Sequence, residues 1–163
     1  MFRPEQINNI KGVLNRISSG LTLNISNIPA YVTSVQLSAE QLVTAVKATD
    51  GTPVQWQTAG DSGIKVLGTM TPVSGRVTFS TFMLPTLDTR KTLLFLDVTY
   101  AAITERYTVK IADTAGVITG NRIIFSPNHW IRIDGDYSRI NIGFTLSYNI
   151  NLDDNAWDGI QNY

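Results

Sequence analysis

Residues 140–152 read Ile-Asn-Ile-Gly-Phe-Thr-Leu-Ser-Tyr-Asn-Ile-Asn-Leu. Polar residues or glycine alternate with seven large apolar residues, which are Ile140, Ile142, Phe144, Leu146, Tyr148, Ile150 and Leu152. A period of two predicts a β-strand with one apolar face. Such a strand would be about 40 Å long at roughly 3.3 Å per residue. It therefore requires an equally long apolar groove, either in its own domain or in a neighbouring molecule.

The same alternation continues through most of the chain. Leu21, Leu23 and Ile25 share one parity, and residues 92–100 and 76–84 repeat the pattern. Clusters of Gly, Pro and Asp separate these segments, and no helical pattern lies between them. About seven to nine short strands with such spacing predict an all-β fold, an antiparallel β-sandwich, with a closed barrel as the second choice.

The N-terminal segment departs from the strand pattern. Pro4 suits the first turn of a helix, and apolar residues follow at helical spacing as Ile7, Ile10, Leu14 and Ile17. We therefore expect a short N-terminal helix that ends at the Ser-Ser-Gly of residues 18–20. The expected organisation is a helical segment at 1–20, a β-sandwich at 21–152 and a C-terminal tail at 153–163.

Composition excludes several classes of protein. The 163 residues suit one domain, and a hydrophobic content of 43% excludes a disordered chain. Thirteen Lys and Arg balance thirteen Asp and Glu without a basic stripe, so no nucleic-acid partner is expected. No apolar run reaches the roughly 18 residues of a membrane span. The absence of Cys excludes disulfides and thiolate chemistry.

The first residues do not read as a signal peptide. A polar segment follows Met1-Phe2-Arg3-Pro4 where a signal peptide would have an apolar stretch. Two alternatives follow: a cytoplasmic protein, or an exported protein whose leader is not present in this chain.

Few residues suggest catalysis or metal binding. His129 is the single imidazole, and no Gly-x-Ser-x-Gly elbow accompanies it, so we interpret it as structural rather than as part of a triad. Asp134 and Asp136 flank a glycine, and Asp153-Asp154 follows residues 140–152. These carboxylates are a candidate Ca²⁺ site or a candidate glycosidase pair, but turn formation explains them more simply. We predict no catalytic residue, no metal and no cofactor.

Aromatic residues suggest a second kind of site. A sugar-stacking platform would draw on six candidates, Trp56, Trp130, Trp157, Tyr31, Tyr137 and Tyr163. Aromatic side chains at the edge of a sandwich also serve packing or partner contacts. A carbohydrate-binding module is therefore an alternative function.

Several motifs in order resemble a known family. Residues 21–37 form a strand, an Ile28-Pro29 corner and a second strand with a Val-x-x-Val-x-Leu pattern. Residues 78–86 form an aromatic-rich strand that ends in Leu84-Pro85-Thr86, and two strand patterns follow at 93–100 and 106–111. Over about residues 17–150 this order resembles a domain of the fimbrillins, subunits of the surface fimbriae (type V pili) of gut and oral anaerobic bacteria.

The resemblance implies a transthyretin-like β-sandwich of the Greek-key type, located at the cell surface and exported as a lipoprotein. It also implies assembly by strand complementation. In this family a protease cleaves stalk subunits after a basic residue, and removal of the N-terminal segment opens a hydrophobic groove. The C-terminal segment of the next subunit then fills the groove as a donor strand, a form of β-augmentation. The implied partners are other pilus subunits or further copies of this chain, with a host glycan or protein as an adhesive ligand.

Three parts of the sequence match these roles by position. Arg16 is the candidate processing site, or else an ordinary solvated Arg at a helix end. Residues 140–152 are either the last strand of the domain or part of the donor segment. The tail then supplies the exchanged piece, with Trp157, Ile160 and Tyr163 as anchors.

The chain also departs from the family pattern. Family members carry two such domains, whereas this chain has the length of one, and it has no Cys for a lipid anchor. Residues 4–17 look helical rather than like a removable strand. A virion protein or another β-structural protein would show similar strand patterns and is a further alternative.

Overall fold

Thirteen strand segments and one 3-10 helix form the regular structure of the residues that the computed structural model describes, 17–57, 63–113, 115, 117–141 and 143–149. The first seven are β1 (Ser19–Ser26), β2 (Val32–Glu40), β3 (Val43–Val46), β4 (Pro53–Trp56), β5 (Ile64–Met70), β6 (Val77–Met83) and β7 (Thr92–Tyr100). The others are β8 (Ile103–Thr108), β9 (Ile111–Ala112), β10 (Ile118–Gly120), β11 (Arg122–Ile123), β12 (Trp130–Asp136), the 3-10 helix η2 (Tyr137–Arg139) and β13 (Phe144–Asn149).

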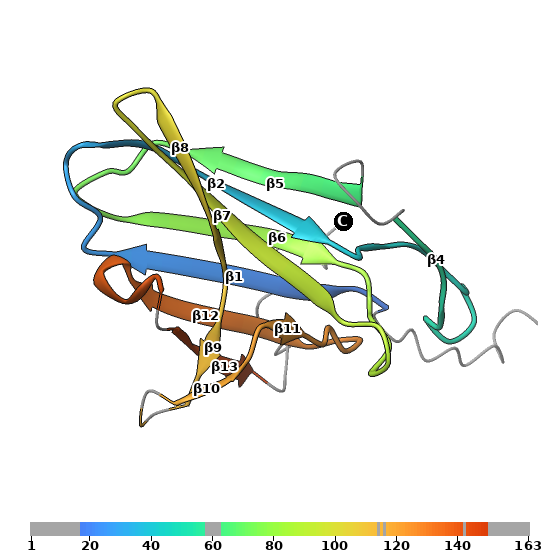
Figure 1. Ribbon diagram of the computed structural model, residues 1–163. Helices are drawn as coiled ribbons and strands as arrows, with labels where there is room; N and C mark the ends of the chain where they lie inside the picture. The colour runs from blue at the N-terminus through green and yellow to red at the C-terminus, as the bar shows by residue number, and fades with distance from the viewer. Residues whose placement is uncertain (1–16, 58–62, 114, 116, 142, 150–163) are drawn as a thin grey trace, which may run out of the picture.

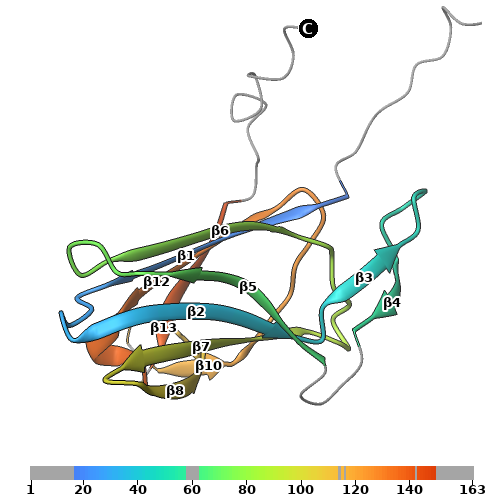
Figure 2. The same ribbon diagram turned by 90° about the horizontal axis from the view of Figure 1, so that it is seen from above.

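Two sheets face each other as the layers of a sandwich (Figure 1 and Figure 2). Sheet A has the strand order β10-β9-β13-β12-β1-β6. Sheet B has the order β11-β7-β2-β5, and β8 also pairs with β7. A separate hairpin of β3 and β4 lies at one end of the sandwich. The prediction of an all-β sandwich is confirmed.

Most strand pairs are antiparallel, but sheet A contains two parallel pairs. Strand β1 runs parallel to β12, with Leu21 opposite Ile131 and Leu23 opposite Ile133. Strand β13 runs parallel to β9 over two residue pairs. Side-chain alternation is the same in parallel and antiparallel strands, so the sequence pattern could not reveal this pairing.

Inward-facing residues of the two sheets form one core. The inner face of β1 carries Leu21, Leu23 and Ile25, while Thr22 and Asn24 point outward. Sheet B contributes Leu37, Leu94, Leu96 and Val98, and sheet A adds Phe79, Ile131 and Ile133 from β6 and β12. Burial of these apolar side chains is the main force that holds the layers together.

The expected long strand at 140–152 begins later than predicted. Tyr137–Arg139 form η2, Ile140 caps it, and β13 starts at Phe144. A side-chain oxygen of Asp136 accepts a hydrogen bond from the backbone N–H of Ser138, which favours a turn here, and Gly143 has a φ of +142°. The chain needs this turn because β13 reverses direction to pair antiparallel with β12. Strand β13 thus lies in the sheet of its own domain, between β12 and β9.

Several predictions concern residues that the structure does not describe. The expected N-terminal helix lies outside the described residues except for Ile17, and Ser19 and Gly20 already belong to β1 rather than to that segment. Arg16, Ile142, Ile150, Leu152, Trp157, Ile160 and Tyr163 also lie outside the described residues.

The position of the core predicts that truncating a buried leucine lowers the free energy of unfolding far more than truncating an exposed leucine. Leu23→Ala removes a side chain that is 0% exposed, whereas Leu87→Ala removes one that is 37% exposed in a turn. We expect Leu23→Ala to lower the free energy of unfolding by about 2–5 kcal/mol because it leaves a cavity. Leu87→Ala should cost clearly less. Urea unfolding followed by circular dichroism measures both, and equal losses would contradict the position of the core.

Candidate functional site

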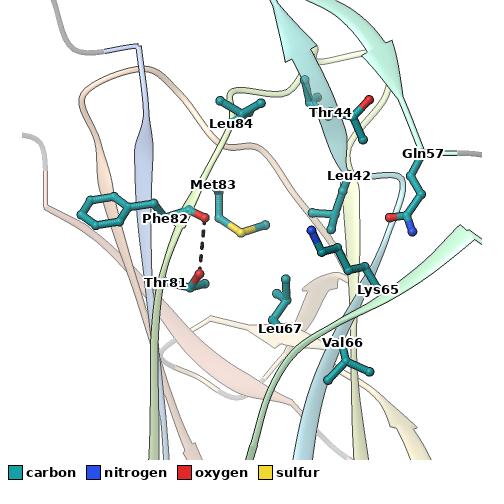
Figure 3. Close-up of a pocket in the computed structure, with 11 residues that line it drawn as sticks. Leu42, Thr44, Gln57, Lys65, Val66, Leu67, Thr81, Phe82, Met83 and Leu84 are labelled. Carbon is teal, nitrogen blue, oxygen red and sulfur yellow. Dashed lines mark hydrogen bonds between the residues drawn. The ribbon is translucent and has the colours of Figure 1, made fainter.

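Both sheets end on the same side of the sandwich, and a groove lies between their last strands. Strand β6 is the end of sheet A and β5 is the end of sheet B among the described residues. The groove has a volume of about 630 Å³. Strands β5 and β6 form its walls together with the β3–β4 hairpin and the residues next to it (Figure 3). An open sheet edge carries unpaired N–H and C=O groups that can pair with another strand.

The groove has apolar side chains at its centre. Leu67 of β5 and Met83 of β6 point into it, and Leu42 faces them from the segment before β3 (Figure 3). Met83 is buried, and Leu42 and Leu67 are partly buried against the core. The unbranched side chain of Met83 can adapt to different neighbours. The groove is therefore suited to apolar side chains of an added strand.

A β-bulge lies at Leu67, one of the side chains that point into the groove. In the β2–β5 ladder, Leu37 pairs with Gly68 and Ser38 pairs with Val66, which leaves Leu67 without a partner in the register. A bulge changes the direction of a side chain and bends an edge strand. Leu67 points into the groove and packs partly against the core, while its neighbour Val66, at the groove wall, is 50% exposed (Figure 3).

Two polar side chains stand at the groove wall near the hairpin. The backbone N–H of Gln57 donates to the carbonyl of Leu42 at 2.8 Å, which ties the base of the hairpin together. The buried side-chain oxygen Oε1 of Gln57 has no hydrogen-bond partner among the described residues. The side chain of Lys65 extends along the wall from β5, and none of the ion pairs between described residues includes it (Figure 3). The groove thus offers an acceptor and a positive charge.

The described part of the apolar stripe that the sequence suggested as a groove-filling strand does not line this groove. Its members belong to the sandwich of their own chain: Ile140, Phe144, Leu146 and Tyr148. Phe144 and Ile140 belong to the core cluster, and Leu146 packs against it. Tyr148 lies in β13 opposite Ile131. The structure therefore separates this apolar stripe from the groove between β5 and β6.

His129 lies in a turn before β12. Its ring nitrogen Nδ1 is 2.7 Å from the carbonyl oxygen of Pro127, and its backbone carbonyl accepts a hydrogen bond from the Ser19 hydroxyl at 2.8 Å. Among the residues described, no serine hydroxyl or carboxylate is hydrogen-bonded to the ring. This geometry corresponds to a turn residue.

Asp134 and Asp136 bind separate local partners. Asp134 accepts hydrogen bonds from Arg132 and Asn24, and the bond from Arg132 is the main reason why the pKa of Asp134 is lowered. Asp136 accepts bonds from Ser138 and Asn27, and those from Ser138 lower its pKa most. Within the described ranges, no group of three or more His, Asp or Glu residues is arranged to hold a metal ion.

The tryptophans do not share one platform. The guanidinium carbon of Arg90 lies 4.6 Å from the centre of the Trp56 ring, at the β3–β4 hairpin. Trp130 lies on sheet A, where its indole N–H donates to the Thr22 hydroxyl at 2.8 Å and its ring meets Phe82 edge to face. Trp157 lies outside the described residues. Tyr31 lies in the β1–β2 loop, where its ring meets that of Tyr100 edge to face, and Tyr137 lies in η2.

Sequence reasoning missed the residues that line the groove. Leu42, Leu67 and Met83 look like ordinary strand residues, since alternation shows which face a side chain occupies but not whether its strand ends a sheet. A local signal existed only for β5, where Val66 and Leu67 are adjacent apolar residues that break the alternation.

Two solved structures are similar to this chain. No protein-family model matches the sequence. No curated protein matches it either. The two solved structures come from Bacteroides ovatus and Parabacteroides distasonis, and each is described as a putative cell adhesion protein. They share 14% and 12% sequence identity with this chain, at a TM-score of 0.40 for both. Each match covers 83% of this chain but only 44% and 51% of the solved chains, so this chain spans about half of their length.

None of the described segments forms a helix of the length and apolarity that a membrane span requires.

The packing of Trp130 predicts that replacing Gly20 lowers the stability of the fold. A Cβ on Gly20 would lie 2.0 Å from the Trp130 ring, whereas a Cβ on Gly120 would meet nothing within 4 Å. We expect Gly20→Ala to displace the indole and to lower the free energy of unfolding by about 1–3 kcal/mol. Gly120→Ala should change it by less than about 0.5 kcal/mol.

Urea unfolding and the tryptophan emission spectrum of both variants test this packing. An unchanged emission spectrum and an unchanged stability for Gly20→Ala would contradict it.

Proposed function

We propose that this chain is a structural subunit of a cell-surface fimbria that assembles by β-strand complementation. The observation that supports the proposal most is the groove with apolar side chains between the end strands β5 and β6. The order of motifs that resembles the fimbrillins agrees with it, as does the all-β sandwich. In this proposal the fold is transthyretin-like and the protein has a structural or adhesive role rather than an enzymatic one.

A strand that entered the groove would satisfy two requirements together. Its backbone would pair with the open edge of β6 or β5 and continue the ladder, which supplies affinity. Every second side chain would point toward Leu42, Leu67 and Met83, which fixes the register. Oε1 of Gln57 would gain the hydrogen bond that it lacks among the described residues.

The proposed donor is the C-terminal tail of a neighbouring copy, residues 153–163. It supplies the apolar anchors Trp157, Ile160 and Tyr163, and it contains three aspartates without a Lys or Arg. Its negative charge complements Lys65 at the groove wall. In this scheme residues 1–20 are the N-terminal segment, 21–152 the sandwich and 153–163 the exchanged tail, and cleavage after Arg16 prepares the subunit for assembly.

The proposal predicts that polymerisation depends on the tail. We expect the full chain, once cleaved after Arg16, to form oligomers in size-exclusion chromatography coupled to light scattering. A chain that ends after Leu152 should remain monomeric because it lacks the anchors. If the shortened chain polymerises as well as the full chain, the proposed donor is wrong.

The groove predicts a second, matched pair of variants. Leu67→Asp places a charge among the apolar side chains of the groove, where burial of an unpaired carboxylate is unfavourable. Val73→Asp changes a side chain that is 74% exposed in the turn between β5 and β6. We expect Leu67→Asp to reduce oligomer formation at least about tenfold, equivalent to roughly 1.4 kcal/mol. Val73→Asp should assemble like the unmodified chain.

Circular dichroism of both variants separates an effect on assembly from an effect on folding. Equal assembly of a folded Leu67→Asp variant would exclude this groove as the acceptor.

A further inference from the structure

Four tyrosines gather around Glu105 at the end of the sandwich opposite the β3–β4 hairpin. Tyr31 comes from the β1–β2 loop, Tyr100 from the end of β7, Tyr107 from β8 and Tyr137 from η2. Figure 1 shows these segments at one end of the molecule, where the tip of the β7–β8 hairpin projects. We call these five residues the tyrosine patch.

Direct contacts hold the patch together. The rings of Tyr31 and Tyr100 meet edge to face, with centroids 5.7 Å apart and an interplanar angle of 76°. The Tyr107 hydroxyl donates a hydrogen bond to the Glu105 carboxylate, which lies two residues earlier on the same face of β8. Tyr31 is 62% exposed, and Glu105 is also exposed, so the patch opens to solvent.

Glu105 carries a stabilised negative charge. Hydrogen bonds from the hydroxyls of Tyr107 and Tyr100 lower the pKa of its carboxyl group. The same bonds raise the pKa of both phenols, so Tyr100 and Tyr107 stay protonated as donors. The carboxylate is therefore ionised at neutral pH and held in place by the surrounding rings.

No cation in the described part of the chain neutralises this charge. The ion pairs found there join Lys91 to Asp88, Arg106 to Asp97 and Arg132 to Asp134. Arg106 follows Glu105 directly but points to the other face of β8, where its guanidinium binds Asp97. The patch thus presents an unpaired anion among electron-rich rings.

The backbone at the hairpin tip is strained. Ala101 and Ala102 both have positive φ angles, 46° and 65°, a conformation that L-residues with a side chain avoid. This two-residue turn sets the position of Tyr100 next to Ile103, its partner across the hairpin, which is 55% exposed.

We propose that the tyrosine patch binds a basic side chain, arginine or lysine, of a partner protein. A cation over a tyrosine face is attracted by the ring, and a carboxylate at the same place adds a charge-assisted hydrogen bond. Arginine fits best because its planar guanidinium stacks on rings and forks onto a carboxylate. Tyrosine-rich surfaces also bind protein segments at a low entropic cost because the side chains are rigid.

This site is independent of the proposed assembly groove. Strand β5 ends sheet B on one side, whereas β8 pairs with β7 on the opposite side of the same sheet. Occupation of one site therefore leaves the other accessible.

The probe for this proposal is a blocked peptide with the sequence Gly-Ser-Arg-Gly-Ser-Arg-Gly-Ser. The reference peptide has citrulline in place of both arginines, which keeps the shape and removes the charge. We expect the arginine peptide to bind the full chain saturably and to shift the ring resonances of the patch tyrosines in NMR spectra. The citrulline peptide should bind at least about fivefold more weakly, the scale of an exposed ion pair.

Two variants test whether residues of the tyrosine patch bind the arginine peptide. Glu105→Gln keeps the shape of the side chain and should weaken binding about fivefold. Tyr31→Ala removes an exposed ring without touching the core and should weaken it about two- to fivefold. The control is Asp88→Asn, which removes an exposed carboxylate from a turn outside the patch, and it should bind like the unmodified chain.

Three results would overturn the proposal: equal affinity for both peptides, an unchanged affinity in Glu105→Gln, or shifts that map away from the patch. Circular dichroism confirms that each variant is folded, so a loss of binding reports on the site.

Discussion

The pairing of β1 on both of its edges is the constraint on which the structure depends. One edge pairs in parallel with β12, whose first residue is Trp130, and the other pairs antiparallel with β6. Because β1 joins β6 to the distant strand β12, sheet A is complete only when its C-terminal strands pair with the start of the chain. This arrangement also leaves the outer edge of β6 at the end of the sheet, which creates one wall of the groove.

Side-chain alternation was sufficient to predict the faces of the strands but not their neighbours. Leu21, Leu23 and Ile25 were placed correctly on the inner face of a strand, and they form the centre of the core. The parallel partner of that strand could not be predicted, because both kinds of ladder show a period of two. Residues 140–143 follow the same alternation but form a turn, since the local hydrogen bonds of Asp136 and the reversal toward β13 outweigh it. The groove and the tyrosine patch were out of reach because each combines segments that only the three-dimensional fold brings together.

Open strand edges carry a risk of uncontrolled aggregation, and β5 shows two features that reduce it. A bulge at Leu67 interrupts the regular ladder, and Lys65 places a positive charge on the same edge strand. Natural proteins use bulges and lysines on edge strands for this purpose. In the proposed assembly, an acidic donor strand would complement the charge of Lys65 at this edge.

The two proposed surfaces make different demands on the fold. An assembly groove is consumed when a subunit joins a polymer, so any ligand-binding site must lie elsewhere to remain useful. Sheet B separates them physically, with β5 at one edge and the β7–β8 hairpin at the other. The groove relies on apolar side chains and an unpaired backbone, which suit a permanent contact that excludes water. The tyrosine patch relies on one exposed ring, three half-buried rings and one exposed carboxylate, which suit a weaker and salt-dependent contact. If the proposed groove holds a donor strand, the tyrosine patch at the other edge of sheet B would still be accessible to a basic partner.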